Sequence, residues 1–437
     1  FGPLFEAHGL VPLQAGGAAP MAGNVVPEKL EPGGTMAVPL LTGDMEFTAV
    51  GTCTEVLGDR VYGFGHPFQN EGNVSLPVGT GYIHTVIANL STSFKLGAMG
   101  KVTGTLQADQ TVGIAGKLGD SPKTVPIKIR VLYADGSADR TYNFNAAVHP
   151  RFTPLLAAVT LNAALNGNHE LPQYHTLEYD LTMEFANDQV LRLQNTMVNA
   201  GMQELFMQVA GPVMVASNNP FQRVPLKKVE GTVRVLDEAR EAQVLSVNLP
   251  KTKYEPGQTV KGFVSYRPFR GAESILPIDF ELPHDLPDGE YQLSVGDWET
   301  YLGEEQSLKP FMFAAESIKD VFTALREVSA VRRNALYIRL VRKPDGVAVG
   351  RTAMPRLPGS RRMVLLESGR SNVTPFVSSS VKTVPTDLVM EGAAQFQIAI
   401  DRGEKVDGPK PQPAPKAPRP SPKPETPQKV VAPAAEG

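Results

Sequence analysis

The chain has 437 residues, a formal net charge of −3 and a pI near 6.2, and 42% of its residues are hydrophobic. This length predicts two or three domains, and the hydrophobic fraction is enough to fill their cores. The mildly acidic balance argues against a nucleic-acid-binding protein, which usually has a concentrated basic surface. No apolar run approaches the about 20 residues of a membrane span.

The first 35 residues are rich in Gly, Pro and Ala, so residues 1–35 are expected to be a loosely draped lead-in. The chain starts at Phe1 without the charged and apolar regions of a signal peptide. A signal peptide is therefore expected on a missing upstream segment. The single cysteine, Cys53, excludes an intrachain disulfide and is expected to be a small buried side chain.

Residues 36–166 carry a β pattern followed by one helix. Short runs rich in Val, Ile, Thr and Tyr are separated by turn signals, one of them at 78–81. Apolar and basic residues alternate over Ile127–Val131, as in a half-exposed strand, and the Asp-Gly pair that follows predicts a hairpin. The apolar stretch 152–165 predicts a short helix that ends at Asn166-Gly167.

Residues 167–223 are expected to extend this domain with a β-hairpin and a helix. The strands are predicted at Leu177–Phe185 and Val190–Val198, and the apolar helix at Met202–Ser217. The methionines of this helix are expected to fill a core. They are Met202, Met207 and Met214.

From residue 224 evenly spaced short strands predict an immunoglobulin-like β-sandwich over 224–312. A small α/β and irregular segment is expected over 313–402. It begins with an amphipathic helix capped by Ser317, continues with a strand at Ala335–Val341, and then turns β-poor, with a basic pair at Arg361-Arg362.

The remaining residues, 403–437, are rich in Pro and Lys and are expected to be a disordered tail. The whole chain is therefore predicted to be mainly β.

The stretch Gly63-Phe64-Gly65-His66-Pro67-Phe68 is the strongest candidate for chemistry. Its glycines allow positive φ or close backbone approach, and Pro67 fixes φ and stops ladder pairing. The result is a collar with few side chains that presents His66 at the end of a strand. Histidine can move a proton near neutral pH. The alternative is that His66 is an ordinary loop residue.

Other motifs give little. The chain has no phosphate-binding loop, no GxSxG and no HExxH, and no cofactor is predicted. His169 and His175 have glutamates nearby, but their spacing does not suit a metal site. An acidic group over 279–288 could hold calcium, although a solvated turn is favoured. No metal site is predicted.

A series of motifs around His66 carries a family resemblance. A Gly-Asp turn at Gly43-Asp44 and the Gly-His pair are followed by Ser93-Phe94-Lys95, by Gly113-Ile114-Ala115-Gly116-Lys117-Leu118, and by Val125-Pro126-Ile127. From about Gly43 to Asn166 the chain resembles the peptidase domain of the stage IV sporulation protein B family of serine endopeptidases. The resemblance implies a barrel-like domain, with His66 as general base.

The same resemblance gives Gly65 and Pro67 the role of positioning His66. It implies that Gly113 and Gly116 allow close backbone approach nearby. The family's serine lies in a GMSGSP motif with an aspartate before it, and this chain has no such motif. His149 stands where the aspartate would fall. The nearby serines, Ser75, Ser91, Ser93 and Ser121, lack the glycine-rich setting of an oxyanion hole.

Three hypotheses follow. The chain is part of an exported serine endopeptidase acting on a protein or peptide substrate, with its serine on an upstream segment. Alternatively, it is a catalytically inactive peptidase-like binding or scaffold protein of the cell envelope. The third hypothesis is an unrelated multi-domain β protein of the envelope. In each case an extracytoplasmic location without an integral membrane span is expected.

Overall fold

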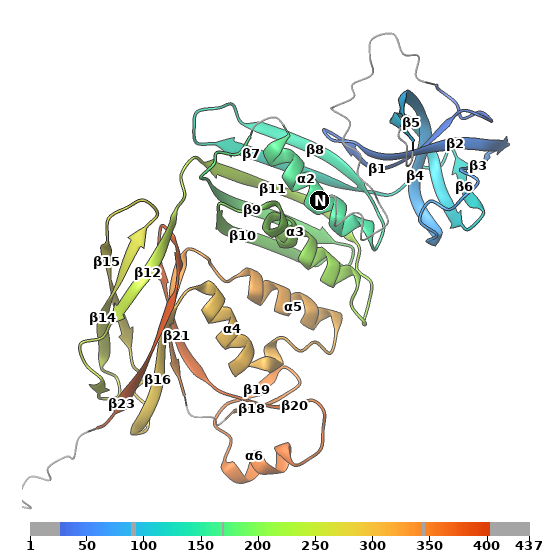
Figure 1. Cartoon of the computed structure of the whole chain (residues 1–437). Helices are drawn as coiled ribbons and strands as arrows, with labels where there is room; N and C mark the ends of the chain where they lie inside the picture. The colour runs from blue at the N-terminus through green and yellow to red at the C-terminus, as the bar shows by residue number, and fades with distance from the viewer. Residues whose placement is uncertain (1–26, 89–92, 168–169, 343–345, 403–437) are drawn as a thin grey trace, which may run out of the picture.

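The structure is a computed structural model that describes residues 27–88, 93–167, 170–342 and 346–402. Half of the chain is β-strand and 18% is helix, so the protein is mainly β, as the sequence predicts. Figure 1 shows a small barrel, an open sheet with helices packed against it, and a pair of packed sheets. The Pro/Lys-rich tail at 403–437 and most of the lead-in lie outside the described residues.

The first sheet has eleven strands in the order β10-β9-β11-β7-β8-β1-β2-β3-β6-β5-β4. They are β1 (Thr35–Gly43), β2 (Phe47–Leu57), β3 (Arg60–Gly63), β4 (Gly72–Ile87), β5 (Phe94–Gln110), β6 (Gly113–Leu118), β7 (Thr124–Tyr133), β8 (Arg140–Ala147), β9 (Thr176–Phe185), β10 (Val190–Val198) and β11 (Leu226–Leu236). An additional pairing of β1 with β4 closes β1 to β6 into a ring. This ring is the barrel.

Strand β1 belongs to both halves of this sheet. Met36 and Ala37 pair with β4 in the barrel, whereas the end of the strand, Leu41–Gly43, pairs with β8 in the open half. The register of β1 against β2 shifts between Pro39 and Leu41. Because a bulge bends a strand, this irregularity lets β1 belong to two differently oriented halves of the same sheet.

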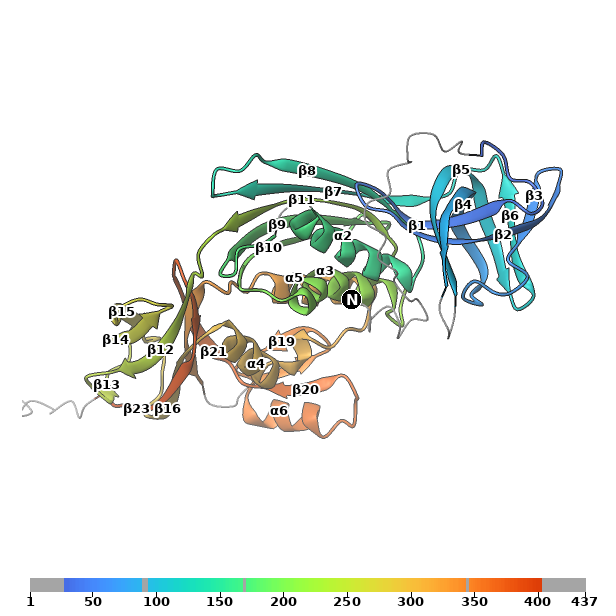
Figure 2. The ribbon, with the colours of Figure 1, turned by 45° about the horizontal axis from the view of Figure 1, so that its top comes forward.

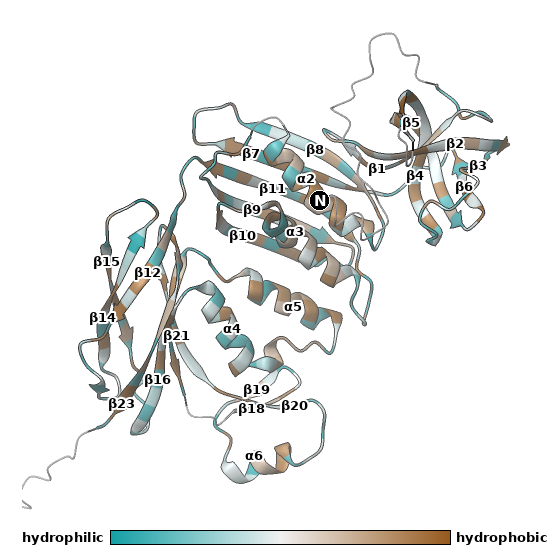
Figure 3. Cartoon of the chain, in the orientation of Figure 1, coloured by the Kyte–Doolittle hydropathy of each residue, from teal (hydrophilic) through white to brown (hydrophobic). Residues whose placement is uncertain are grey.

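Helices α2 (Phe152–Asn166) and α3 (Met202–Ser217) pack against the open half, as Figure 2 shows. In α2, 12 of 15 residues are buried, as expected for a helix that is apolar on all sides. In Figure 3 brown, hydrophobic segments lie on both helices and on the strands beside them. The barrel and the open half therefore share one hydrophobic core.

Strand β11 corrects the predicted start of the sandwich. It runs parallel to β7 and antiparallel to β9, so it belongs to the first sheet. Its Val229, Val233 and Val235 are buried in the first core. Alternating hydrophobicity predicts which side chains of a strand turn inward, but it does not say which core they join.

Two further sheets form the sandwich around a second core. In order, the sheets are β15 (Ser274–Glu281), β14 (Thr259–Pro268), β12 (Glu241–Asn248) and β22 (Val389–Glu391), and β13 (Lys253–Tyr254), β23 (Ala393–Ile400), β16 (Gly289–Gly296), β17 (Ala335–Val341) and β21 (Ser379–Pro385). Four of these nine strands lie beyond residue 312.

The prediction that 345–400 is β-poor is wrong. This segment supplies β21, β22 and β23, and also a small separate sheet. In order, the small sheet contains β19 (Thr352–Met354), β18 (Gly346–Val349) and β20 (Val373–Phe376). The strands of the small sheet have three or four residues each, and strands this short leave little local signal.

Three helices and one 3₁₀ turn complete the second half of the chain. They are α4 (Trp298–Leu308), η1 (Pro310–Met312), α5 (Ile318–Ser329) and α6 (Gly359–Leu366). The predicted cap of α5 is confirmed, because Ser317 Oγ accepts a hydrogen bond from the Asp320 amide at 3.3 Å. Helix α4 was not predicted. Within the described residues, no helix has both the length and the apolar character that a membrane crossing requires.

Two smaller predictions are also wrong. The expected turn at 78–81 lies inside β4, where its glycines let neighbouring strands approach: a Cβ on Gly79 would lie 2.1 Å from the Lys101 carbonyl oxygen. The three methionines of α3 are 38–52% exposed instead of buried. The inward face of α3 is already occupied by Leu205, Phe206, Val209 and Val213. Cys53 is buried, as expected.

Candidate functional site

The Gly-His-Pro segment forms a sharp loop directly after β3. Phe64 and Gly65 both have a φ of +72°, and the Gly65 amide donates to the Gly63 carbonyl at 2.9 Å. A positive φ is unusual for phenylalanine, so the surroundings must hold it in place. The Phe64 ring lies against Gly51, where an added Cβ would come within 2.3 Å of the ring.

A buried carboxylate anchors the far side of this loop. Asp109, at the end of β5, is fully buried, and its side chain accepts hydrogen bonds from three backbone amides of the loop. The donors are Phe68 at 2.7 Å, Gln69 at 2.8 Å and Glu71 at 3.1 Å. An ionised carboxylate bonded to several amides is a strong local anchor, which fixes the loop relative to the barrel.

His66 is exposed at the tip of this loop. Its Nδ1 lies 2.8 Å from the carbonyl oxygen of Pro67. A carbonyl can only accept, so in the neutral imidazole Nδ1 carries the proton and Nε2 has the free lone pair. The ring also lies 5.5 Å from the Phe64 ring, centroid to centroid. The loop thus presents Nε2 as a base.

The other residues expected to shape the site lie around and beneath the loop. Gly65 supplies the positive φ, and Pro67 supplies the carbonyl that holds His66. On β6, a Cβ at Gly113 would lie 3.0 Å from the Gly63 carbonyl oxygen and 3.6 Å from the Gly65 amide nitrogen. Gly116 lies deeper, where a Cβ would come within 3.3 Å of the Val61 side chain and 2.9 Å of a backbone oxygen.

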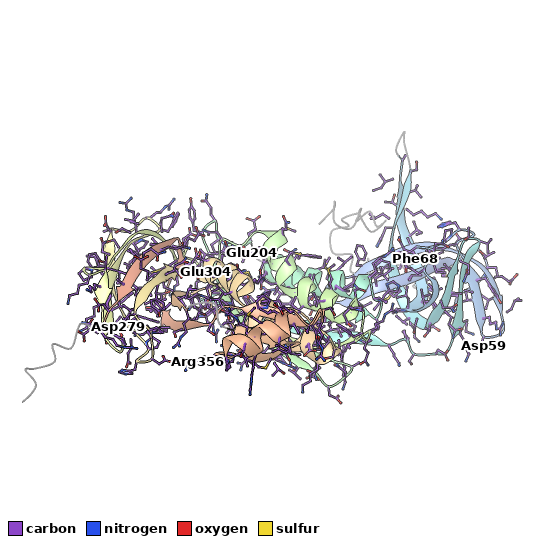
Figure 4. All side chains as sticks on the ribbon, turned by 90° about the horizontal axis from the view of Figure 1, so that it is seen from below. Asp59, Phe68, Glu204, Asp279, Glu304 and Arg356 are labelled. Carbon is purple, nitrogen blue, oxygen red and sulfur yellow. The ribbon has the colours of Figure 1, made fainter. Side chains whose placement is uncertain are left out.

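Aromatic rings join the loop to the start of α2. The centroid of Phe68 lies 6.4 Å from that of Phe64 and 6.5 Å from that of Phe152. Figure 4 marks Phe68 in the barrel. His149 stacks on Phe152 at 4.4 Å, so the second His-Pro pair of the chain lies beside the loop that carries the first.

Charged side chains link the same two segments. The Glu71 carboxylate lies 2.8 Å from Arg151 and 3.5 Å from Nε2 of His149. Arg151 also donates to Gln69 at 3.0 Å. Burial lowers the pKa of His149, while the nearby Glu71 carboxylate opposes this shift. The cluster ties the end of the His66 loop to the start of α2.

Sequence reasoning missed Asp109 and Glu71. Glu71 follows His66 by only five residues, but nothing local distinguishes it from a solvated charge. Asp109 hydrogen-bonds to residues about 40 positions earlier. The only local cue is an acidic residue at the end of a predicted strand, which is common on protein surfaces.

The structure brings no nucleophile to His66 among the residues it describes. Within them, the only hydrogen-bond partner of the His66 ring is Pro67. Ser75, Ser93 and Ser121 are exposed, and Ser91 lies outside the described part. His149, at the position of the family's aspartate, contacts Glu71 and Phe152.

The possible metal ligands are engaged in other contacts. His169 is outside the described residues, and His175 is buried with Nδ1 2.8 Å from the Pro172 carbonyl. Carboxylates of the acidic group pair with cationic side chains. The pairs are Asp279–Lys382, Asp285–Arg342, Asp285–Arg356 and Asp288–Arg402. In the described ranges no group of three or more potential ligands is suitably placed for a metal ion.

A cavity of about 250 Å³ lies between α3, α4 and α5. Trp298, the only tryptophan of the sequence, lines it beneath the guanidinium of Arg333, whose Cζ lies 4.4 Å from the centroid of the Trp298 ring. Arg333 is also paired with Glu204, which Figure 4 labels near the middle of the molecule. Burial raises the pKa of the lining Tyr179 to about 12.

The chain matches no protein-family model, no curated protein and no solved structure.

Proposed function

We propose that this chain carries the general base of an exported serine endopeptidase, with His66 as the base and the nucleophile on a segment outside the described residues. The supporting observation is the loop itself. Two residues at positive φ and three amides bonded to Asp109 fix its backbone, while the histidine at its tip stays exposed. A loop constrained in this way suits a side chain that must meet an incoming group.

The chemistry assigned to each atom follows from the hydrogen bonds. The Pro67 carbonyl accepts a hydrogen bond from Nδ1–H of His66, so Nε2 can take the proton of a serine hydroxyl as the serine attacks a peptide carbonyl. The same nitrogen then returns the proton to the leaving amine. Here a backbone carbonyl orients the imidazole, a role that an aspartate has in many serine peptidases.

A second candidate function is a peptidase-like binding or scaffold module of the cell envelope. The observation that favours it is the absence of a hydroxyl or carboxylate partner on the His66 ring within the described part of the chain. In this case the loop is retained for its shape, and His66 moves no proton.

Fluorophosphonate labelling of the protein expressed from its complete reading frame distinguishes the peptidase from the binding module. The peptidase proposal predicts labelling of a serine and hydrolysis of casein. His66→Ala should reduce both by about 10³-fold, since it removes a general base. His284→Ala, which changes a histidine in the sandwich part, is the matched control and should keep full activity.

Because His66 is exposed, its replacement should change the free energy of unfolding by no more than about 0.5 kcal/mol. A loss of labelling in His66→Ala can then be attributed to the missing general base and not to unfolding. Labelling that survives His66→Ala contradicts the assignment of the base. A folded protein with neither labelling nor hydrolysis favours the binding module.

A further inference from the structure

The cavity between α3, α4 and α5 is large enough for a small ligand. Its volume of about 250 Å³ exceeds the about 150 Å³ that can hold a benzene molecule in a protein core, so it has room for about ten non-hydrogen atoms. Figure 1 shows the three helices near the centre of the molecule. Buried Tyr179, Leu193 and Arg333 line the cavity, and so do Met207 of α3 and Val328 of α5, which are 52% and 38% exposed. The exposed pair places the mouth of the cavity between α3 and α5.

The lining combines many apolar side chains with a few polar ones. Pro212, Trp298 and Leu325 are among the apolar ones. Pockets of this composition hold small molecules, and their few polar side chains recognise the polar group of the ligand. Within the described part of the chain no aspartate or glutamate lines the cavity, and Arg333 is its one charged lining residue. The Glu204 carboxylate that pairs with Arg333 lies outside the lining. The charge at the cavity therefore favours an anionic ligand over a cationic one.

Several hydrogen-bond donors of the lining have no partner among the described residues. Arg333 bonds to Glu204 through Nη1, and its remaining N–H groups are without a described acceptor. The same holds for the indole N–H of Trp298. The side-chain oxygen of Gln208 accepts from the Tyr179 hydroxyl at 3.2 Å, which leaves the Gln208 amide N–H groups without a described partner. A hydrocarbon in the cavity would displace water from these donors without replacing its hydrogen bonds, so the donors favour a ligand with acceptor oxygens.

We propose that this cavity binds a compact apolar carboxylic acid, with the carboxylate at Arg333 and the apolar body against Trp298 and Met207. A carboxylate accepts several hydrogen bonds at once, and a guanidinium matches its charge and its planar geometry. Room for about ten non-hydrogen atoms is too little for a helix or strand of a partner protein. This proposal does not depend on the peptidase chemistry.

The fluorescence of Trp298 tests the proposal, because Trp298 is the only tryptophan of the sequence and lines the cavity. Titration of the full chain with phenylacetate, a carboxylate of about the right size, should change the emission saturably with a Kd of about 1 mM. Phenylacetamide has the same shape without the charge. It should bind about tenfold more weakly, because a hydrogen bond between two charged groups is stronger than one to a neutral acceptor.

Two variants locate the binding. Arg333→Gln should abolish the preference for phenylacetate over phenylacetamide, and this ratio does not depend on how stable the variant is. Lys261→Gln makes the same charge change on β14 and should keep the preference. Val328→Phe narrows the mouth and should weaken phenylacetate binding about tenfold. Val215→Phe adds the same ring to another exposed position, outside the lining, and should not change the Kd.

Four outcomes would overturn the proposal. The first is an emission that phenylacetate does not change saturably well above the expected Kd. The second is equal affinity for phenylacetate and phenylacetamide, or tighter binding of the cation phenethylamine. The third is an unchanged preference for the acid in Arg333→Gln, which would separate the carboxylate from this guanidinium. The fourth is unaltered binding in Val328→Phe, which would place the ligand elsewhere.

Discussion

At the scale of single residues, Asp109 determines the geometry of the candidate site. Its side chain is fully buried and accepts hydrogen bonds from three backbone amides of the His66 loop, so a side chain without an acceptor at this position would leave these amides unpaired. Unpaired buried donors are costly, because they lose water without gaining a partner. Asp109 is thus a positioning residue that never touches the imidazole.

Asp109→Ala should destabilise the protein by about 3 kcal/mol and release the loop. The direct measurement is hydrogen exchange at the amides of Phe68, Gln69 and Glu71, which should lose their protection. Asp109→Asn keeps one acceptor oxygen and should show a smaller loss. Unchanged protection in Asp109→Ala would contradict the anchoring role.

His149 should make stability depend on pH. Burial lowers its pKa below the usual 6.5, against the opposing charge of Glu71. Below pH 6.5 the unfolded chain therefore binds more protons than the folded chain. The free energy of unfolding should fall as the pH drops through 6.5, and this contribution should level off below the lowered pKa.

The measurement compares urea unfolding of wild type and His149→Asn from pH 8 to 5. The charged groups that act on this histidine, Glu71, Asp109, Arg151 and Arg223, are present in both proteins, so the difference isolates its titration. The wild type should lose more stability across this range. Parallel curves would show that burial has not lowered the pKa.

At the scale of elements, a buried arginine holds α4 against the sandwich. Arg339 of β17 is fully buried, 3.0 Å from Glu304 and 2.7 Å from Glu305. It also donates to the Tyr301 carbonyl at 3.0 Å and lies over that ring. Figure 4 labels Glu304 among the helices of the central region. The Arg339 guanidinium is paired with the carboxylates of Glu304 and Glu305, so removing the guanidinium takes away a partner from both carboxylates.

Arg339→Met should destabilise the protein by about 3–5 kcal/mol, since it removes the cation paired with Glu304 and leaves Glu305 with Lys309 alone. Adding Glu304→Gln should recover part of this loss, because Glu305 still pairs with Lys309 at 2.6 Å. Thermal or urea unfolding measures both variants. A double variant that is less stable than Arg339→Met would show that the ion pairs are not the cause.

At the scale of the whole molecule, the sandwich is assembled from separated stretches of chain. Strand β16 pairs with β17 on one side and β23 on the other, and both partners lie beyond residue 312. Strand β12 pairs with β22 in the same way. The boundary at 312 therefore cuts through two sheets.

A fragment of residues 238–402 should fold cooperatively, and a fragment of residues 224–312 should not. The shorter fragment lacks four of the nine strands and exposes the second core. Circular dichroism during thermal unfolding and the dispersion of amide signals in NMR spectra distinguish the two. A cooperative transition in the shorter fragment would contradict this account of the sandwich.

The sequence by itself determined the mainly β class, the helices at 152–166, 202–217 and 318–329, and the Ser317 cap. These features depend on hydrophobic period and on residues within one helical turn. It also singled out the Gly-His-Pro loop, because positive φ and a fixed proline are local properties.

Only the tertiary structure decided how these parts combine. Three features join residues far apart in the chain: the pairing of β11 with β7, the pairing of β1 with both β4 and β8, and the Asp109 anchor. Such contacts depend on which hydrophobic faces meet and which backbone groups still need partners. A local sequence pattern determines neither of these. The same alternation of apolar and polar residues is compatible with either hydrophobic core, and an aspartate that anchors a loop looks the same in the sequence as one on the surface.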